Sequence, residues 1–332
     1  MAVQGRRRGR AVNPETFAEW HRRQGRRVVR TSSSWWYEAS PRVYQSFPLH
    51  AIVRPPDDEL LEFLRREGAL ALRYSTPLDA PVGRVSYHVV CDDPDYGLHK
   101  LDGRARNAVR TGLKRCRVER VSLERVADEG WALEVDTCRR QGRDVPLSNQ
   151  EWRRRYLSAA ELPGFEAWGA LVDGRLGAAL LCVQIGDWCE VLAQQCLAEF
   201  LGARINNALT FVFTESTVRR SDVRSIFYTL QSLDAPASVD DFKFHMGYVA
   251  RPVRQRVVFH PRAEHLVGPW SHRLVTAALR LRPKSHLLAK AEGMLRFRLQ
   301  GERRAEDQEW PRCLQAPQRE PARELGSRSS SV

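Results

Sequence analysis

The chain has 332 residues, of which 42% are hydrophobic and 9% aromatic, enough to bury a core, so we exclude global disorder. The formal net charge is +13, and the seven cysteines form no C-x-x-C pair and no zinc-ligand spacing. The longest uncharged stretch, residues 176–186, is too short to cross a bilayer, and the Arg-rich first residues lack the apolar region of a signal peptide. We therefore expect a cytoplasmic protein with free thiols and no metal.

The positive charge is concentrated in three segments. Residues 1–30 hold nine Arg and two Glu, residues 99–125 hold nine basic and three acidic residues, and residues 271–298 hold seven basic residues and one Glu. Such segments can contact the phosphates of a cofactor, of tRNA or of lipid headgroups, or they can be solvated surface.

The first half of the chain predicts helices alternating with strands. In chain order the predicted elements are a short helix at 14–23, a helix at 59–68, strands at 69–75 and 84–91, a basic helix at about 99–115, a strand at 117–126 and a helix at 128–142. The aromatic but turn-rich residues 32–50 are expected to wrap over the surface. Ser148 and Glu151 have the spacing of a capping box that opens a further helix.

From Phe165 onward the pattern predicts a second α/β unit. Residues 166–197 alternate as three strands, with hairpin turns at Asp173–Gly174 and Gly186–Asp187. The predicted elements that follow are a helix at 203–220, a strand at 225–233, a helix at 239–246 and a strand at 253–259. This order describes an antiparallel meander that gains crossover-linked strands.

Composition divides the chain into five parts. We expect a flexible basic arm (1–34), an N-terminal half (35–162), a C-terminal core (163–262), a basic helical appendage (263–300) and a disordered tail (301–332).

Two stretches carry a resemblance to a known superfamily. They are the basic helix "HKLDGRARNAVRTGLKRC" (99–116) and the strand, loop and Phe-Lys helix in "YTLQSLDAPASVDDFKFHMGY" (228–248). Over about residues 35–262 the chain resembles the GNAT superfamily of N-acyltransferases, and more particularly the branch that includes the Fem peptidoglycan bridge-forming transferases. The resemblance implies a mixed α/β sheet flanked by helices, a partial GNAT-like N-terminal half and an acyl-transfer activity.

The donor-binding loop departs from the superfamily pattern. Most GNAT enzymes hold the CoA pyrophosphate with a Gly-rich loop, but here the matching "QQCLAEFLGARIN" (194–206) has a single glycine. A helix N-terminus still offers N–H groups and a positive dipole end to phosphate. The candidate cofactor-binding residues are Gly202, Ala203, Arg204, Asn206 and Asn207. Acyl-CoA and aminoacyl-tRNA both stay open as donors, since Fem-like relatives use the latter.

Lys243 is the first candidate catalytic residue. It lies beside the face that Phe242 and Met246 share on a short helix, and Gly247 follows where a left-handed C-cap is expected. The resemblance implies that this helix stands at a cleft between two parts of the sheet. Lys243 could there bind a phosphate or stabilise an oxyanion, and an exposed helix lysine is the alternative.

Three further residues are candidates for proton transfer. Alternation places Glu190 and Gln194 on one face of their strand, where Glu190 could act as a base or could face solvent. Tyr228 could protonate a leaving group, as tyrosines do in many GNAT enzymes, or could belong to the core. Asp234 follows a strand end where ligands collect, or it forms a turn before Pro236.

The candidate substrate-binding residues are Gln194 and one face of the basic helix. Arg106, Asn107, Arg110 and Lys114 lie on that face by helical spacing. A cationic face of this kind suits a phosphate or polyanion, and it also suits solvated surface.

The segment 269–301 predicts two short helices broken at Pro283. Leu287, Leu288, Met294 and Leu295 share one face among basic residues, which is consistent with peripheral contact with an anionic membrane at its inner face or with docking on the core.

The sequence therefore predicts a GNAT-fold acyltransferase that moves an acyl group from acyl-CoA or a similar thioester to an amine or hydroxyl. The resemblance favours a cell-envelope glycan or its precursor as acceptor. The alternatives are an aminoacyl-tRNA-dependent Fem-like transferase and a non-catalytic protein that binds nucleic acid or anionic membrane.

Overall fold

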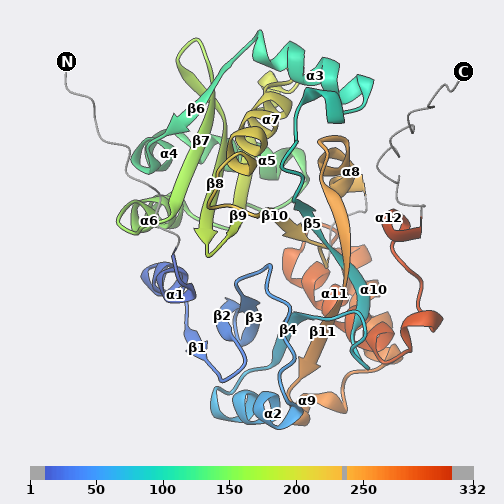
Figure 1. Ribbon diagram of the computed structural model, residues 1–332. Coiled ribbons are helices and arrows are strands. Elements are labelled where there is room, and N and C mark those ends of the chain that lie inside the picture. Colours follow the sequence, from blue (N-terminus) through green and yellow to red (C-terminus); the bar gives the residue numbers. More distant parts are fainter. Residues whose placement is uncertain (1–11, 234–237, 316–332) are drawn as a thin grey trace, which may run out of the picture.

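The computed structural model describes residues 12–233 and 238–315 and builds them around one continuous sheet (Figure 1). Within those residues the sheet has 11 strands, in the order β1-β2-β3-β4-β11-β5-β10-β9-β8-β7-β6. The strands are β1 (Val28–Arg30), β2 (Trp35–Ser40), β3 (Val43–Phe47), β4 (Ala71–Thr76), β5 (Arg84–Cys91), β6 (Arg117–Val121), β7 (Phe165–Val172), β8 (Arg175–Ile185), β9 (Trp188–Cys196), β10 (Ser225–Leu230) and β11 (Val249–Phe259). The helices are α1 (Pro14–Arg23), α2 (Asp57–Arg66), α3 (Gly103–Leu113), α4 (Leu123–Glu129), α5 (Trp131–Arg140), α6 (Asn149–Ala160), α7 (Ile205–Val218), α8 (Ser238–His245), α9 (Pro261–Glu264), α10 (Pro269–Leu281), α11 (His286–Gly301) and α12 (Arg312–Gln315). This mixed sheet flanked by helices confirms the expected α/β fold class.

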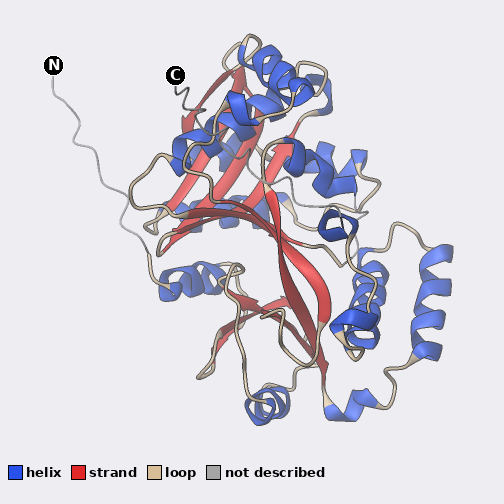
Figure 2. Cartoon of the chain, turned by 45° about the vertical axis from the view of Figure 1, so that its right-hand side comes forward, coloured by secondary structure: helices blue, strands red, loops and turns tan. Residues whose placement is uncertain are grey.

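The C-terminal half contains the antiparallel meander that the sequence predicts. β7, β8 and β9 pair in chain order. Asp173 (φ 49°), Gly174 (φ 79°) and Gly186 (φ 59°) adopt the left-handed conformation expected at the two hairpin turns. Helices lie on both sides of these strands (Figure 2): α3 and α7 cover one face, and α1 with α4–α6 covers the other.

β11 joins the two halves of the sheet. Its residues 249–255 pair with β5 and its residues 254–259 pair with β4, both antiparallel. In Figure 1, β11 runs from α8 down to α9. The strand is longer than the predicted 253–259 because the chain begins to pair with β5 directly after the turn at Gly247.

The N-terminal segment is part of the core from residue 12, so the expectation of a flexible arm is wrong for its described residues. Phe17 and Trp20 on α1 are buried, and the Trp20 indole donates a hydrogen bond to the Arg155 carbonyl (3.0 Å). Residues 32–50 form the hairpin of β2 and β3, with Trp36 and Phe47 fully buried, where a surface segment was expected. The β-forming aromatic side chains of the two strands outweigh the turn formers around them. Residues 1–11 lie outside the described chain.

Residues 301–315 also pack on the fold, which corrects the expectation of a tail that is disordered from 301. The buried Gln308 side chain accepts a hydrogen bond from the Val85 N–H (2.7 Å) and donates one to the Gly83 carbonyl (3.1 Å). The Gln308 side-chain amide thus hydrogen-bonds to backbone groups at the beginning of β5, as the backbone of a neighbouring strand would. Residues 316–332 lie outside the described chain.

Two predicted boundaries in the first half are wrong. The strand predicted over 117–126 ends at Val121, because Ser122 caps α4 by accepting a hydrogen bond from the Arg125 N–H (3.1 Å). The helix predicted over 128–142 is divided at Gly130 into α4 and α5. The capping box that opens α6 is present as predicted, between Ser148 and Glu151.

Candidate functional site

The parallel strands β9 and β10 pair over only three residues and then part. Ser225–Phe227 of β10 pair with Trp188–Glu190 of β9, and the ladder between these two described strands ends there. β9 continues to Cys196 and β10 to Leu230. The two strands are thus not paired with each other beyond Glu190 and Phe227, and the carboxyl ends of parallel strands are where α/β sheets bind ligands.

Tyr228 lies at the start of this opening. The pairing of β10 with β5 shifts register between Phe227 and Thr229, so Tyr228 sits in a β-bulge, a feature that re-aims a side chain. Its hydroxyl donates a hydrogen bond across the opening to the Gln194 side-chain carbonyl on β9. Burial, with a smaller effect from the Asp240 carboxylate, raises the pKa of Tyr228 well above its ordinary value.

Gln194 is held in one orientation by α7. Its amide nitrogen donates hydrogen bonds to Asn206 Oδ1 and Thr210 Oγ1, both at 2.8 Å. The amide carbonyl must then face Tyr228, because the nitrogen is already bound on the other side. The predicted substrate residue Gln194 therefore links the strand opening to the first turns of α7.

Lys243 projects from α8 to the same place. Its ammonium is ion-paired with Asp240 and lies 5.3 Å from the centroid of the Tyr228 ring. The second Asp240 oxygen accepts a hydrogen bond from the Tyr87 hydroxyl (2.7 Å). Only 12% of the Lys243 side chain is exposed, so the ammonium belongs to a half-enclosed polar cluster and does not extend into bulk water.

Glu190 does not join this cluster, which corrects the expectation that it shares a face with Gln194. The pairing of β8 with β9 shifts register at Leu192, and this bulge inverts the alternation. Glu190 therefore faces the opposite side of the sheet. There it is fully buried and accepts hydrogen bonds from the His50 backbone N–H (2.8 Å) and from His50 Nδ1 (2.7 Å), whose ring stacks on Trp188.

A recess of about 350 Å³ opens at the N-terminus of α7, and we call it the donor recess. It is lined by Arg104, Ala105, Asn107, Ala108, Thr111, Gly202, Arg204, Asn207, Phe242 and His245. The first N–H groups of a helix lack intrahelical acceptors and carry partial positive charge. With two arginines beside this helix end, the recess has the chemistry of an anion site.

Three of the five residues predicted to hold a cofactor line the donor recess, namely Gly202, Arg204 and Asn207. Asn206 turns toward the sheet, and Ala203 packs against the core. α7 begins at residue 205, two residues later than predicted, because Arg204 takes a left-handed conformation (φ 61°) at the N-cap.

The close approach of α3 to α7 depends on Gly112. A Cβ at this position would lie 2.4 Å from the Arg204 carbonyl oxygen and 2.9 Å from the Ala208 Cβ. The absence of a side chain lets α3 cross the N-terminus of α7 in contact, which brings Arg104 and Asn107 to the rim of the donor recess.

The basic face of α3 is divided among three recesses. Asn107 lines the donor recess, whereas Arg106 and Arg110 line a second one of about 410 Å³ that also contains Arg219. Lys114 lies at a third, beyond the end of the helix. The four residues predicted to act as one substrate-binding face are thus not gathered around one site.

Two residues of the polar cluster were not predicted from the sequence. Asp240 could have been predicted as a partner of Lys243, because it precedes the lysine by three residues on the same helix. Tyr87 could not, because it lies 153 residues from Asp240 along the chain and only the sheet brings the two together. The candidate Asp234 lies outside the described residues.

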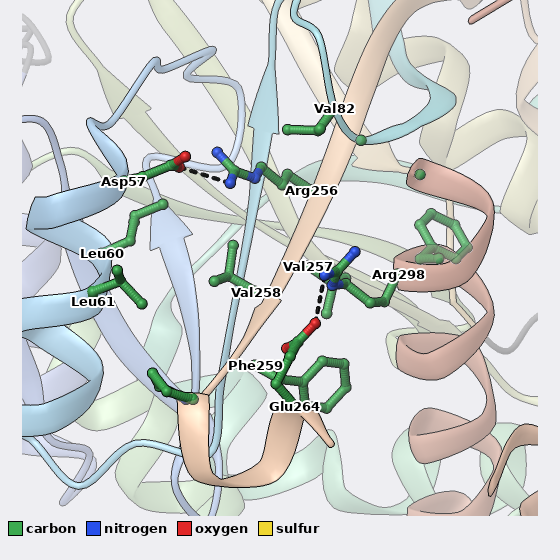
Figure 3. Close-up of a pocket in the computed structure, with 14 residues that line it drawn as sticks. Asp57, Leu60, Leu61, Val82, Arg256, Val257, Val258, Phe259, Glu264 and Arg298 are labelled. Atoms are coloured by element: carbon green, nitrogen blue, oxygen red, sulfur yellow. Dashed lines mark hydrogen bonds and ion pairs between the residues drawn. The ribbon is translucent and has the colours of Figure 1, made fainter. Parts of the chain in front are cut away.

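A further groove of about 470 Å³ lies between α2, β11 and α11, away from the predicted residues (Figure 3). Its walls are apolar, with Leu60, Val258 and Phe297 among them. Its two arginines are both paired, Arg256 with Asp57 (2.7 Å) and Arg298 with Glu264. The polar groups of this groove thus neutralise one another.

Across residues 12–233 and 238–315, no three His, Cys, Asp or Glu side chains are grouped so that they could hold a metal ion. A search of the same described ranges finds no helix long and apolar enough to span a bilayer.

Solved structures resemble the fold of most of this chain, although no protein-family model and no curated protein matches the sequence. The crystal structure of FemX aligns with a TM-score of 0.51 at 12% identity, over 75% of this chain and 92% of that one. The C-terminal domain of an Agrobacterium fabrum protein described as a lysylphosphatidylglycerol synthetase aligns with a TM-score of 0.50 at 14% identity, over 80% of this chain and 91% of that domain. The chain shares the fold of FemX and of this synthetase domain. The resemblance expected from residues 99–116 and 228–248 is thereby confirmed at the level of the fold.

Proposed function

We propose that the protein is an acyltransferase, which moves an acyl group from a thioester donor such as acyl-CoA to an amine or hydroxyl. The observation that carries the proposal is the parting of β9 and β10, with Tyr228 hydrogen-bonded to Gln194 across the gap and Gln194 bound to Asn206, the neighbour of a residue that lines the donor recess. The Fem-like GNAT fold supports the same reaction class. An envelope glycan or its precursor is the acceptor that this fold favours.

The donor binds with its phosphates in the recess and its carbonyl in the strand opening. Arg104, Arg204 and the N-terminus of α7 offset the phosphate charge. Beyond Glu190, backbone N–H groups of β9 that are not paired with β10 can donate to the carbonyl oxygen and stabilise the oxyanion.

The acceptor amine then attacks the carbonyl carbon, the C–S bond breaks and the amine loses a proton to water. Tyr228 gives its hydroxyl proton to the departing thiolate and recovers one from solvent. The Lys243 ammonium over the Tyr228 ring stabilises the transient phenolate, and Asp240 with Tyr87 holds that ammonium in place. In this scheme Lys243 therefore contributes to proton transfer only through its effect on Tyr228.

Aminoacyl transfer from an aminoacyl-tRNA is the second candidate. The arginines of α3 continue from the donor recess (Arg104) into the second recess (Arg106 and Arg110), which suits an extended phosphate backbone. FemX and the lysylphosphatidylglycerol synthetase domain share the fold. A non-catalytic binding protein is the third candidate.

Thermal unfolding with acetyl-CoA, a longer acyl-CoA and bulk tRNA separates these candidates. A donor present at 100 times its Kd should stabilise the protein by about 2.7 kcal/mol. Stabilisation by a CoA ester that is lost in Arg104→Gln/Arg204→Gln supports the first proposal. The control is Arg65→Gln, an exposed arginine on α2 that should leave the shift unchanged.

If tRNA alone stabilises the protein, and this stabilisation falls steeply as the salt concentration rises, then the donor is aminoacyl-tRNA and not acyl-CoA. A protein that responds to neither ligand and transfers no acyl group would overturn the assignment as an enzyme.

A further inference from the structure

The exposed apolar side chains of this molecule are concentrated in one short segment. Among the described residues, half of the large apolar side chains that are exposed fall between positions 266 and 287. They are 50% to 85% exposed, and they are Leu266, Trp270, Leu274, Leu281 and Leu287. Single exposed apolar residues are ordinary, but a group of this size marks an interaction surface.

The segment forms an outer hairpin on the sheet. α11 packs against β11 through the buried Met294 and Phe297, whereas α10 packs on α11 and none of its residues is buried in the described structure. His272 Nε2 lies 2.8 Å from Glu292 Oε1 and ties the two helices together. In Figure 2, α10 is the outermost helix at the right-hand edge.

The apolar face predicted on α11 is exposed at Leu287 but buried farther along the helix, so this part docks on the core, one of the two expected alternatives. Met294 and Leu295 of α11, expected to meet a membrane or the core, are buried in the fold. The free face belongs to α10, where Trp270, Leu274 and Leu281 are spaced by four and seven residues and so form one stripe along the helix.

Positive charge borders this stripe. Arg273 and Arg280 are exposed on the adjoining side of α10, and Arg282 and Lys284 are exposed in the turn to α11. The one carboxylate between residues 261 and 290, Glu264, is ion-paired with Arg298. The surface is thus apolar and cationic, without an acidic group of its own to balance it.

We propose that the outward face of α10, together with the turn at 282–285, docks on an anionic lipid bilayer. The helix lies parallel to the membrane plane, with Trp270, Leu274 and Leu281 at the boundary between headgroups and acyl chains. The exposed arginines contact lipid phosphates. Helices that lie in a membrane interface combine these features, namely a Trp- and Leu-bearing apolar face beside basic residues.

Other occupants fit this surface less well. Nucleic acid would satisfy the cations but would leave the leucine side chains in water, since bases are bound by aromatic stacking. A second copy of the chain would bring two cationic faces together without acidic partners. A bilayer of anionic lipid satisfies both the charge and the apolar stripe.

Vesicle sedimentation tests the proposal with the full chain. Wild type should bind vesicles of phosphatidylcholine with 30% phosphatidylglycerol at least about tenfold more tightly than pure phosphatidylcholine vesicles, since each cation adds electrostatic attraction. Leu274→Asp/Leu281→Asp should reduce binding about tenfold or more while every arginine is retained. The control is Leu113→Asp, which places one aspartate at an exposed leucine of the basic helix α3 and is compared with the single change Leu274→Asp.

Several results would overturn the docking site. These are wild-type protein that does not bind the anionic vesicles, a double variant that binds like wild type, or a Leu113→Asp variant that loses binding equally. Binding of tRNA without binding of the anionic vesicles would likewise overturn the bilayer as the occupant of this surface. Because both leucines are exposed, the variants should keep the wild-type circular dichroism and Tm, which are measured alongside.

Discussion

Tyr228 is the residue on which the proposed chemistry depends most directly. Burial raises its pKa above the ordinary value, so the hydroxyl is protonated at neutral pH and has a proton to give. Its hydrogen bond to Gln194 holds the proton at the strand opening. Lys243 lies over the ring and not at the hydroxyl, which makes the lysine a positioning residue for Tyr228 in our scheme.

We expect Tyr228→Phe to lower kcat by about 10²-fold or more, because the proton donor is lost. The ring remains to pack against Tyr248, so the stabilisation by the donor should be unchanged. Release of free thiol from acyl-CoA measures kcat, and thermal unfolding measures donor binding. An unchanged kcat would remove Tyr228 from the mechanism.

Glu190 provides the contrasting case. In Glu190→Gln the side-chain carbonyl can still accept the hydrogen bond from the His50 backbone N–H, and the residue faces away from the opening. We expect kcat to stay within about tenfold of wild type, below the loss that follows removal of a general base. A fall of about 10²-fold or more in the same thiol-release assay, with an unchanged Tm, would restore Glu190 as the base.

At the scale of elements, strands with regular two-residue alternation could be predicted from the sequence, but the bulges that interrupt this alternation could not. The meander of β7–β9 follows from two-residue periodicity and from turn residues at 173–174 and 186–187. The bulge at Leu192 has no sequence signal, yet it decides that Glu190 and Gln194 face opposite sides. Tyr87 and Asp240 meet only because β5 and α8 are brought together by the sheet, which local pattern does not encode.

The crossing of α3 over α7 gives a prediction at this scale. Gly112→Ala should lower the free energy of unfolding by about 1–3 kcal/mol, since the added methyl meets the Arg204 backbone and the helices must separate. Donor stabilisation should weaken with it, because Arg104 moves away from the recess.

The control for this change is Gly103→Ala at the start of the same helix, where a Cβ has open space around it. It should leave stability unchanged or slightly higher, since Ala is the better helix former. Urea unfolding measures both variants. Equal stability of the two would show that α3 and α7 are not held by this contact.

At the scale of the whole molecule, two buried histidines couple stability to pH. Burial lowers the pKa of His21 well below its ordinary value and that of His88 to about 3. In the unfolded chain both titrate near 6.5, so below that pH the unfolded state binds protons that the folded state does not. The free energy of unfolding should therefore fall as the pH drops from 6.5 toward 3.

Each histidine should contribute a slope of about 1.4 kcal/mol per pH unit in this window. Urea unfolding at about pH 7, 6 and 5 measures the slope, and His88→Gln should remove one histidine's share of it. A His88→Gln variant with the wild-type slope would show that this ring is protonated in the folded protein.

The position of β11 between β4 and β5 has a consequence for the order of events during synthesis. Among the described strands, β11 alone pairs with both β4 and β5, so without it the sheet separates into β1–β4 and β5–β10. A nascent chain therefore cannot close its sheet until residues 249–259 have left the ribosome. Until then the edges of β4 (71–76) and β5 (84–91) that pair with β11 stay unpaired, so we expect chains stopped before residue 249 to bind chaperones more than the full-length chain does.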